Sequence, residues 1–265
     1  MTPGLTHLAT VGSTNDWLLA RADTLADGHW VIADRQTAGR GRRGRVWNDG
    51  AGNLMASVLV RSDGPVQQLS FVAALALHGA ITNFLPLPGG GDSASAERVG
   101  VAQTPTRAGF AVSRLPPEGE ERLMLKWPND VLLDGVKVSG ILLERTGEAL
   151  VIGFGVNIAS HPEATERPAT SLLAAGLGAP EPLALLSPLM DGFAHWRSVW
   201  AVQGFAPIRN AWLARAAGLG QPIIARLGET VVPGLFDGLD DDGALRLRLD
   251  DGSMRAIHAG EVFAL

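Results

Sequence analysis

Apolar residues in the first 160 positions fall mainly in short runs bounded by glycine, proline and charged residues, a pattern typical of strands. The runs predict strands at 5–10, 30–33, 53–60, 123–126, 131–133, 136–144 and 149–156. Helical spacing predicts helices over about 16–26 and 65–84, and the second has a proline at its start, where the missing N–H costs least. We therefore expect a large domain of the α/β (α+β) class.

The pattern changes towards the C-terminus. Helices are predicted at 182–203 and 205–217, and from residue 220 short β-like runs at 223–227, 234–239, 244–249 and 254–257 alternate with clusters of aspartate and glycine. Such spacing is typical of a small β-barrel of about 45 residues. The predicted division is 1–218 for the larger domain and 219–265 for the barrel.

Residues 86–121 are rich in glycine, proline and serine and contain few large apolar side chains. Loops of this length are uncommon inside compact domains and are usually functional or flexible. We expect a flexible insertion, with a weak strand at 109–114.

Composition narrows the class of protein. The chain is 46% hydrophobic and 18% charged, which supports a sizeable core, and it contains no cysteine. A disulfide scaffold, a thiolate zinc site and a cysteine nucleophile are therefore excluded. The net charge of −5 argues against a dedicated nucleic-acid binder. Neither a signal peptide nor an 18-residue apolar run is present, and the six histidines show no metal-ligand spacing, so a cytoplasmic, non-membrane protein is predicted.

A glycine- and arginine-rich segment at 39–45 is the first candidate for chemistry. It matches G-x-G-x-x-G formally, but Arg40, Arg42 and Arg43 fill its variable positions and turn-forming residues follow it where a dinucleotide-binding helix would begin. Glycines and guanidinium groups together suit a loop that binds a small anionic ligand. A solvated run of charge, or a short nucleic-acid patch, is the alternative.

The segment Lys126-Trp127-Pro128-Asn129-Asp130 is the second candidate. The proline favours an extended or turn conformation, in which Lys126 and Asp130 can face one pocket, the first for phosphate and the second for magnesium. The alternative is a loop in which the two form only an exposed ion pair. Lys137 lies in an apolar strand and needs a charged partner, such as a bound carboxylate or phosphate. Asn157 ends another apolar run and is either a ribose or base ligand or a turn residue.

Five segments in this order resemble the biotin protein ligases, and the resemblance covers nearly the whole chain. The segments are Gly12-Ser13-Thr14-Asn15, the run from Gln36 to Arg45, the run from Lys126 to Asp130, the run from Lys137 to Leu142, and Gly155-Val156-Asn157. The resemblance implies a mixed-sheet catalytic domain of the class II synthetase-like biotin/lipoate ligase type, followed by an SH3-like β-barrel.

The resemblance also implies a reaction in two steps. Biotin is activated with ATP to biotinyl-5′-adenylate, and a lysine of a biotin carboxyl carrier protein, an acetyl-CoA carboxylase subunit, then accepts the biotin. The implied biotin-binding residues are Ser13, Thr14, Asn15, Gln36, Arg40, Gly41, Arg42 and Lys137. The implied ATP- or adenylate-binding residues are Arg42, Arg43, Lys126, Asn129, Asp130 and Asn157, with Lys137 and Arg42 catalytic and Asp130 a ligand of Mg²⁺.

Many relatives carry an N-terminal DNA-binding domain. Only twelve residues precede Ser13, so we expect no DNA binding and no repressor activity. Separately, we expect the protein to be a monomer or a weak homodimer. Two alternatives remain open: a lipoate or octanoate ligase or transferase of the same fold, and a nucleic-acid-binding module that uses the arginine-rich loop.

Overall fold

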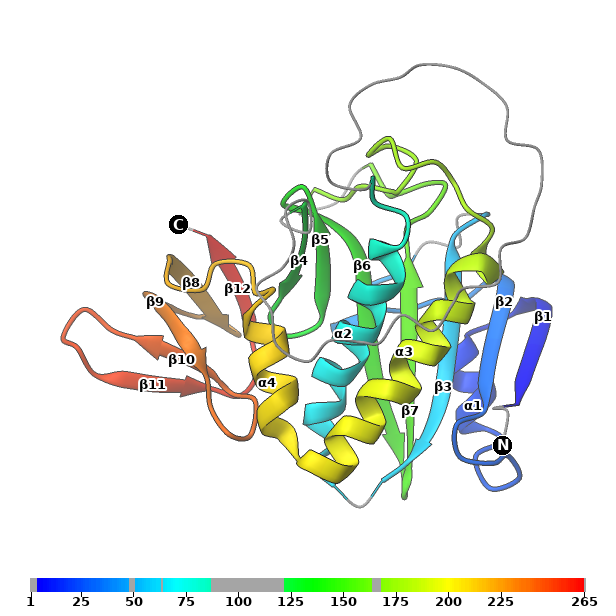
Figure 1. Ribbon diagram of the computed structural model, residues 1–265, viewed down its shortest axis with the longest axis horizontal. Coiled ribbons are helices and arrows are strands. Elements are labelled where there is room, and N and C mark those ends of the chain that lie inside the picture. The colour runs from blue at the N-terminus through cyan, green and yellow to red at the C-terminus, as the bar shows by residue number, and fades with distance from the viewer. Residues whose placement is uncertain (1–3, 48–50, 63, 87–121, 164–167, 265) are drawn as a thin grey trace.

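The computed structural model describes residues 4–47, 51–62, 64–86, 122–163 and 168–264. The strands of the larger sheet are β1 (Leu5–Val11), β2 (Trp30–Gln36), β3 (Leu54–Arg61), β4 (Leu123–Lys126), β5 (Asp130–Leu133), β6 (Val136–Thr146) and β7 (Ala149–Val156). Their spatial order is β1-β2-β3-β7-β6-β5-β4, with β1 and β2 parallel and all other neighbours antiparallel (Figure 1). The predicted mixed sheet is therefore confirmed.

Helices cover both faces of this sheet, and the side chains of its central strands are therefore buried on both sides. On one face lie α2 (Leu69–Thr82), α3 (Pro182–Gln203) and α4 (Phe205–Leu213), with α2 and α3 side by side (Figure 1). On the other face α1 (Thr14–Leu19) packs its Leu18 against Val31 and Leu59. Successive side chains of a strand point to opposite faces, so Ile32 belongs to the main core and Val31 to the smaller one.

A second sheet follows α4 and confirms the small all-β region. Its strands are β8 (Pro222–Leu227), β9 (Thr230–Leu239), β10 (Leu245–Arg248), β11 (Met254–Ile257) and β12 (Glu261–Ala264), in the antiparallel order β11-β10-β9-β8-β12. Sequence analysis missed β12, which is only four residues long and contains Glu261. The buried indole of Trp127 donates to the carbonyl of Gly243 and so links the two sheets.

The predicted extent of the first helix is wrong. The prediction was 16–26, whereas α1 begins at Thr14 and ends at Leu19. Ser13 is the N-cap, and its hydroxyl accepts from the backbone N–H of Asp16. The helix stops at Leu19, and the guanidinium of Arg61 donates to the carbonyls of Ala22 and Leu25, which do not continue the helix.

The other differences concern element ends. The helix predicted at 65–84 is a 3₁₀ turn at Val66–Gln68 followed by α2, and the helix predicted at 205–217 ends at Leu213. Residues beyond Leu213 cannot continue the helix because they pair with β4: Leu125 N–H donates to Arg215 O, and Ala217 N–H donates to Leu125 O, both at 2.8 Å. The strand predicted at 109–114, with nearly all of the 86–121 insertion, lies outside the described residues.

The predicted Asp134-Gly135 hairpin turn is confirmed between β5 and β6. Both residues have positive φ, 52° and 78°, as the two central positions of a tight hairpin require. Within the described ranges, no helix combines the length and the apolar character needed to cross a membrane.

Candidate active site

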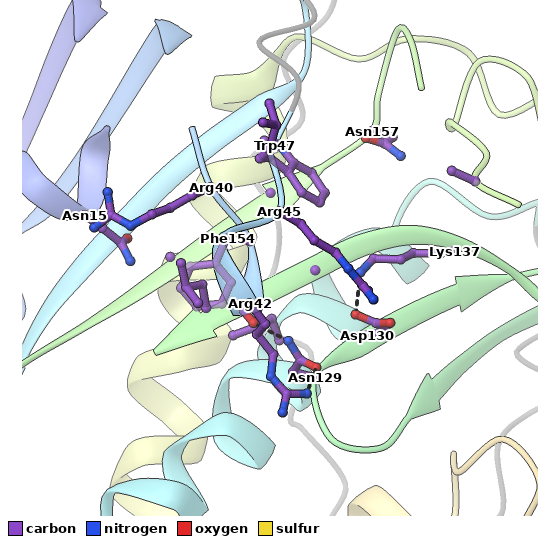
Figure 2. A pocket seen from close by; sticks show the side chains of 18 of the residues that line it. Asn15, Arg40, Arg42, Arg45, Trp47, Asn129, Asp130, Lys137, Phe154 and Asn157 are labelled. Carbon is purple, nitrogen blue, oxygen red and sulfur yellow. Dashed lines mark hydrogen bonds and ion pairs between the residues drawn. The ribbon is translucent and has the colours of Figure 1, made fainter. Parts of the chain in front are cut away.

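A cavity of about 470 Å³ lies over β6 and β7, beside the arginine-rich segment. Figure 2 shows side chains from this segment, from the β4–β5 turn and from β6 pointing into one space. Its size falls within the range of small-molecule sites. All predicted site residues except Arg43 line it: Ser13, Thr14, Asn15, Gln36, Arg40, Gly41, Arg42, Lys126, Asn129, Asp130, Lys137 and Asn157.

One end of the cavity is a buried group of neutral polar side chains. Because β1 and β2 are parallel, the residues that follow β1 begin next to Gln36 at the end of β2. The backbone N–H and the hydroxyl of Thr14 donate to Gln36 Oε1 at 2.7 and 2.9 Å. The Ser57 hydroxyl on β3 lies 2.7 Å from Thr14 Oγ1 and 2.6 Å from Asn15 Oδ1. Burial makes these groups strong candidates for hydrogen bonds to a ligand.

Glycines form the floor between the two ends. A Cβ on Gly153 would lie 2.5 Å from Asn15 Oδ1, so this position must lack a side chain for Asn15 to approach. A Cβ on Gly155 would lie 2.4 Å from two carbons of the Trp47 indole, and one on Gly140 would lie 3.4 Å from a third. Gly140 and Gly155 pair across β6 and β7, and together they form a slot that holds Trp47.

Arg40 anchors the start of the arginine-rich segment. Its guanidinium makes a two-point contact with Asp16 at 2.6 Å for both bonds, and further bonds of 2.9–3.0 Å to the carboxylate of Glu144. These contacts raise the pKa of Arg40, and the hydrogen bonds from Arg40 lower the pKa of Asp16. The charge therefore serves to dock the segment on α1 and β6.

The remaining arginines of the segment divide between the cavity and the small sheet. Arg42 donates to Asn129 Oδ1 at 3.0 Å, and burial lowers its pKa while the nearby Asp130 opposes that shift. Arg45 lies 3.1 Å from the carboxylate of Glu261 and Arg43 lies 3.8 Å from it. Arg43 is thus directed to β12 and does not line the cavity.

Lys137 and Asp130 form the charged end of the cavity. Lys137 Nζ donates to Asp130 Oδ1 at 2.6 Å across the β5–β6 hairpin (Figure 2), and the Lys137 side chain is about one third exposed while that of Asp130 is 12% exposed. The charged partner that the sequence requires for Lys137 is therefore Asp130. The ammonium group also faces the cavity, so it can contact an anionic ligand as well.

Two further predicted residues combine a cavity position with a structural contact. Asn157 is 5% exposed, and its Nδ2 donates to the carbonyl of Thr170 at 3.0 Å, so it ties the end of β7 to a later loop. Lys126 Nζ lies 5.6 Å from the centre of the Phe263 ring. Both still line the cavity.

The comparisons with known proteins agree with this geometry. Residues 8–157 match the biotin/lipoate A/B protein ligase family, and residues 218–265 match the biotin protein ligase C-terminal domain. The chain belongs to the biotin/lipoate A/B protein ligase family. A biotin--[acetyl-CoA-carboxylase] ligase of Paracoccus denitrificans is 42% identical to it, over 97% of this chain and 98% of that protein.

Other members of the family lie further away in sequence. A biotin--[acetyl-CoA-carboxylase] ligase of Mycobacterium tuberculosis is 35% identical over 97% of this chain and 88% of its own length. The structure of the biotin protein ligase of Aquifex aeolicus in complex with biotin and ATP superimposes with a TM-score of 0.78 at 24% identity and covers 99% of each chain. That likeness supports the family fold.

Within this family fold, the structure decides between the alternatives for the arginine-rich segment. The segment contains one 3₁₀ turn at Arg42–Gly44, with Arg43 at a φ of 58°, and no α-helix occurs among its described residues, 39–47 and 51–53, where a dinucleotide-binding helix would begin. A merely solvated run of charge is also wrong for Arg40 and Arg42, because their guanidinium groups bond to residues on α1, β6 and the β4–β5 turn.

Sequence analysis missed several residues that shape the site: Asp16, Trp47, Ser57, Glu144 and Glu261. Three are carboxylates that pair with arginines of the segment, and Glu144 lies 104 positions from its partner Arg40. For Trp47 the only sequence signal is its position two residues after Arg45, at the end of the arginine-rich segment. An acidic residue that ends an apolar strand was the one available signal for Glu144.

The donor set around Asp130 fits a magnesium ion only if a ligand supplies most of the oxygens. Among the described residues, no group of three or more histidine, aspartate or glutamate side chains could hold a metal. Magnesium bound with nucleotides commonly uses one or two protein carboxylates, phosphate oxygens and water. Asp130 supplies one such carboxylate at the cavity wall.

Proposed function

We propose that this protein is an ATP-dependent biotin protein ligase. It activates biotin to biotinyl-5′-adenylate and transfers the biotin to a lysine of a biotin carboxyl carrier protein of acetyl-CoA carboxylase. The observation that carries the proposal is one cavity with buried neutral polar groups at one end and lysine and arginine side chains at the other.

The neutral end suits a ring that both donates and accepts hydrogen bonds. We assign the ureido ring of biotin to Ser13, Thr14, Asn15 and Gln36, whose hydroxyl and amide groups offer donors and acceptors without a net charge. The glycine floor and the Trp47 indole provide an apolar passage of the kind that an aliphatic side chain prefers.

The charged end suits the meeting of two anions. In the first step a carboxylate oxygen of biotin attacks the α-phosphorus of ATP, and pyrophosphate leaves with the electrons of the broken P–O bond. We assign Lys137 and Arg42 to this point, because fixed cations offset the repulsion between carboxylate and phosphate and stabilise charge in the transition state. Arg40 and Gly41 lie over biotin. Arg43 contacts Glu261 on β12 and so holds the arginine-rich segment against the small sheet.

The nucleotide belongs beside the β4–β5 turn. We assign its phosphates and sugar to Lys126, Asn129, Asp130 and Asn157. Asp130 is the residue that would hold Mg²⁺, and the ion, when bound, neutralises phosphate charge. In the second step the amine of the carrier lysine attacks the acyl carbon, a proton is released and AMP leaves.

The same proposal includes a cytoplasmic location, a monomer or weak homodimer, and no binding of DNA. The contacts of Arg40 and Arg42 within the protein speak against a nucleic-acid-binding module, because both guanidinium groups already bond to side chains of the protein itself. A steep salt dependence of DNA binding would contradict this part.

The test is pyrophosphate release from ATP in the presence of biotin, lipoate or octanoate, followed by transfer to an acetyl-CoA carboxylase carrier domain. We expect release and transfer with biotin and neither with the other two acids. Transfer of lipoate or octanoate in place of biotin would identify the alternative ligase of the same fold, and no release with any acid would contradict the proposal.

A further inference from the structure

The carboxylate of Glu144, near the end of β6, joins two segments of the site that the chain separates widely. It accepts from Asn15 Nδ2 at 2.7 Å and from Arg40 Nε and Nη2 at 2.9–3.0 Å. Its side chain is about one quarter exposed. Glu144 itself does not line the cavity, whereas both of its partners do.

The contact with Glu144 determines which way the Asn15 amide points. An ionised carboxylate has only acceptors, so the NH₂ group of Asn15 must face Glu144. The amide oxygen then faces the Ser57 hydroxyl at 2.6 Å, in the space that Gly153 leaves open. A neutral partner at position 144 would permit both orientations of the amide.

The contact with Arg40 determines where the arginine-rich segment starts. Glu144 and Asp16 hold the guanidinium between β6 and α1, and Figure 2 shows Arg40 reaching across to lie beside Asn15. Charge-assisted bonds are roughly twice as strong as neutral ones. Loss of one carboxylate therefore weakens the docking of the segment without removing it.

We propose that Glu144 is a positioning residue of this site, which orients the Asn15 amide and docks Arg40 so that both meet the ring end of biotin. The inference rests on the proposed function and adds a specificity role for a residue outside the cavity. Glu144 contacts no reacting atom in this account, so it acts on the binding of biotin and not on the attack at phosphorus.

The test is the variant Glu144→Gln, which keeps the size of the side chain and removes its charge. We expect the KM for biotin to rise about tenfold or more, since bonds to charged groups contribute about 1.5–3 kcal/mol. The KM for ATP and kcat stay within about twofold of wild type, because the Lys137 end is untouched. A purely structural role would change both KM values and the urea midpoint together.

Asp134→Asn is the matched control. Asp134 makes a similar two-point pair with Arg122, at 2.7 and 2.8 Å, and lies outside the cavity. We expect its KM for biotin to be unchanged. A second measurement is the double-mutant cycle with Asn15→Ala. This substitution should raise the KM for biotin by a smaller factor in the Glu144→Gln background than in wild type, because Glu144 acts partly through Asn15.

If the wild-type protein releases pyrophosphate in a biotin-dependent reaction and Glu144→Gln leaves the KM for biotin unchanged, this inference is overturned while the proposed function stands. Equal rises in both KM values, or full additivity in the cycle, also overturn it. Absence of biotin-dependent pyrophosphate release in the wild-type protein overturns the proposed function and this inference together. If Glu144→Gln does not fold, Glu144→Asp gives the same comparison, since it keeps the charge and withdraws the carboxylate from both partners.

Discussion

Substitution of Gly155 by alanine tests whether the position of Trp47 controls the site. The new Cβ would lie 2.4 Å from indole carbons Cε2 and Cζ2 and 2.9 Å from Nε1. Carbon atoms pack at about 3.5–4.0 Å, so the indole has to retreat by about 1 Å or more. Gly155 cannot move instead, because β7 is paired on both sides, with β3 and with β6.

The indole takes the arginine-rich segment with it. The backbone N–H of Trp47 donates to Gly39 O at 3.0 Å, and Arg40 bridges to Val46, so displacement at one end is transmitted to the other. Overpacking of this kind costs about 1–3 kcal/mol. If the segment bears that cost, the docked conformation becomes about 5- to 150-fold less populated relative to the undocked one.

We therefore expect Gly155→Ala to release biotinyl-5′-adenylate faster than wild type by a factor in that range. The measurement is the dissociation rate of purified enzyme–adenylate complex in the absence of carrier. Gly79→Ala on α2 is the matched control, because its Cβ meets nothing within 4 Å, and we expect it to retain the intermediate normally. A wild-type dissociation rate in Gly155→Ala would refute the reasoning.

Three further predictions concern single side chains. Lys137→Met removes the ammonium group beside Asp130, and we expect biotin-dependent pyrophosphate release to fall at least about a hundredfold while the fold stays intact. A near-wild-type rate would contradict the role of Lys137. Arg42→Gly removes a cation of the cavity wall that we assign to the adenylate, so we expect the intermediate to escape and streptavidin-detected labelling of non-cognate lysines to increase. Unchanged acceptor selectivity would argue against this role. Burial lowers the pKa of His78 from 6.5 to about 4, so the unfolded chain takes up a proton as the pH falls from 7 to 5 while the folded chain does not. The free energy of unfolding should drop by about 2 kcal/mol over that interval, and His78→Gln should flatten this dependence in urea titrations.

Local sequence signals predicted residues that line the cavity, because each motif is short and rigidly placed. Ser13, Thr14 and Asn15 follow a strand and begin a helix, and the proline in the run from Lys126 to Asp130 produces the β4–β5 turn. Once these segments lie at neighbouring strand ends, the residues converge on the cavity. Their individual roles stay predictions until the variants are measured.

The ends of helices were less predictable because tertiary contacts decided them. The first helix stops at Leu19 while Arg61 from β3 bonds to carbonyls farther along the chain. The last one stops at Leu213 because the following residues pair with β4. Both competing partners come from distant parts of the sequence, which periodicity does not register.

Local patterns along the chain predicted the strands of the larger sheet, the small second sheet, the β5–β6 hairpin and residues that line the cavity, since strands, turns and motifs depend on neighbouring residues. The mixed sheet was expected from the resemblance to a known family. The partners of the cavity residues became known from the folded chain: Asp130 for Lys137, Glu144 for Asn15 and Arg40, and the Gly140–Gly155 slot for Trp47. These pairings depend on the order of strands in the sheet, which brings β6 beside β7 and places the start of α1 over both. An electrostatic or steric contact acts through space, so the pairing of two residues cannot be read from their positions along the chain.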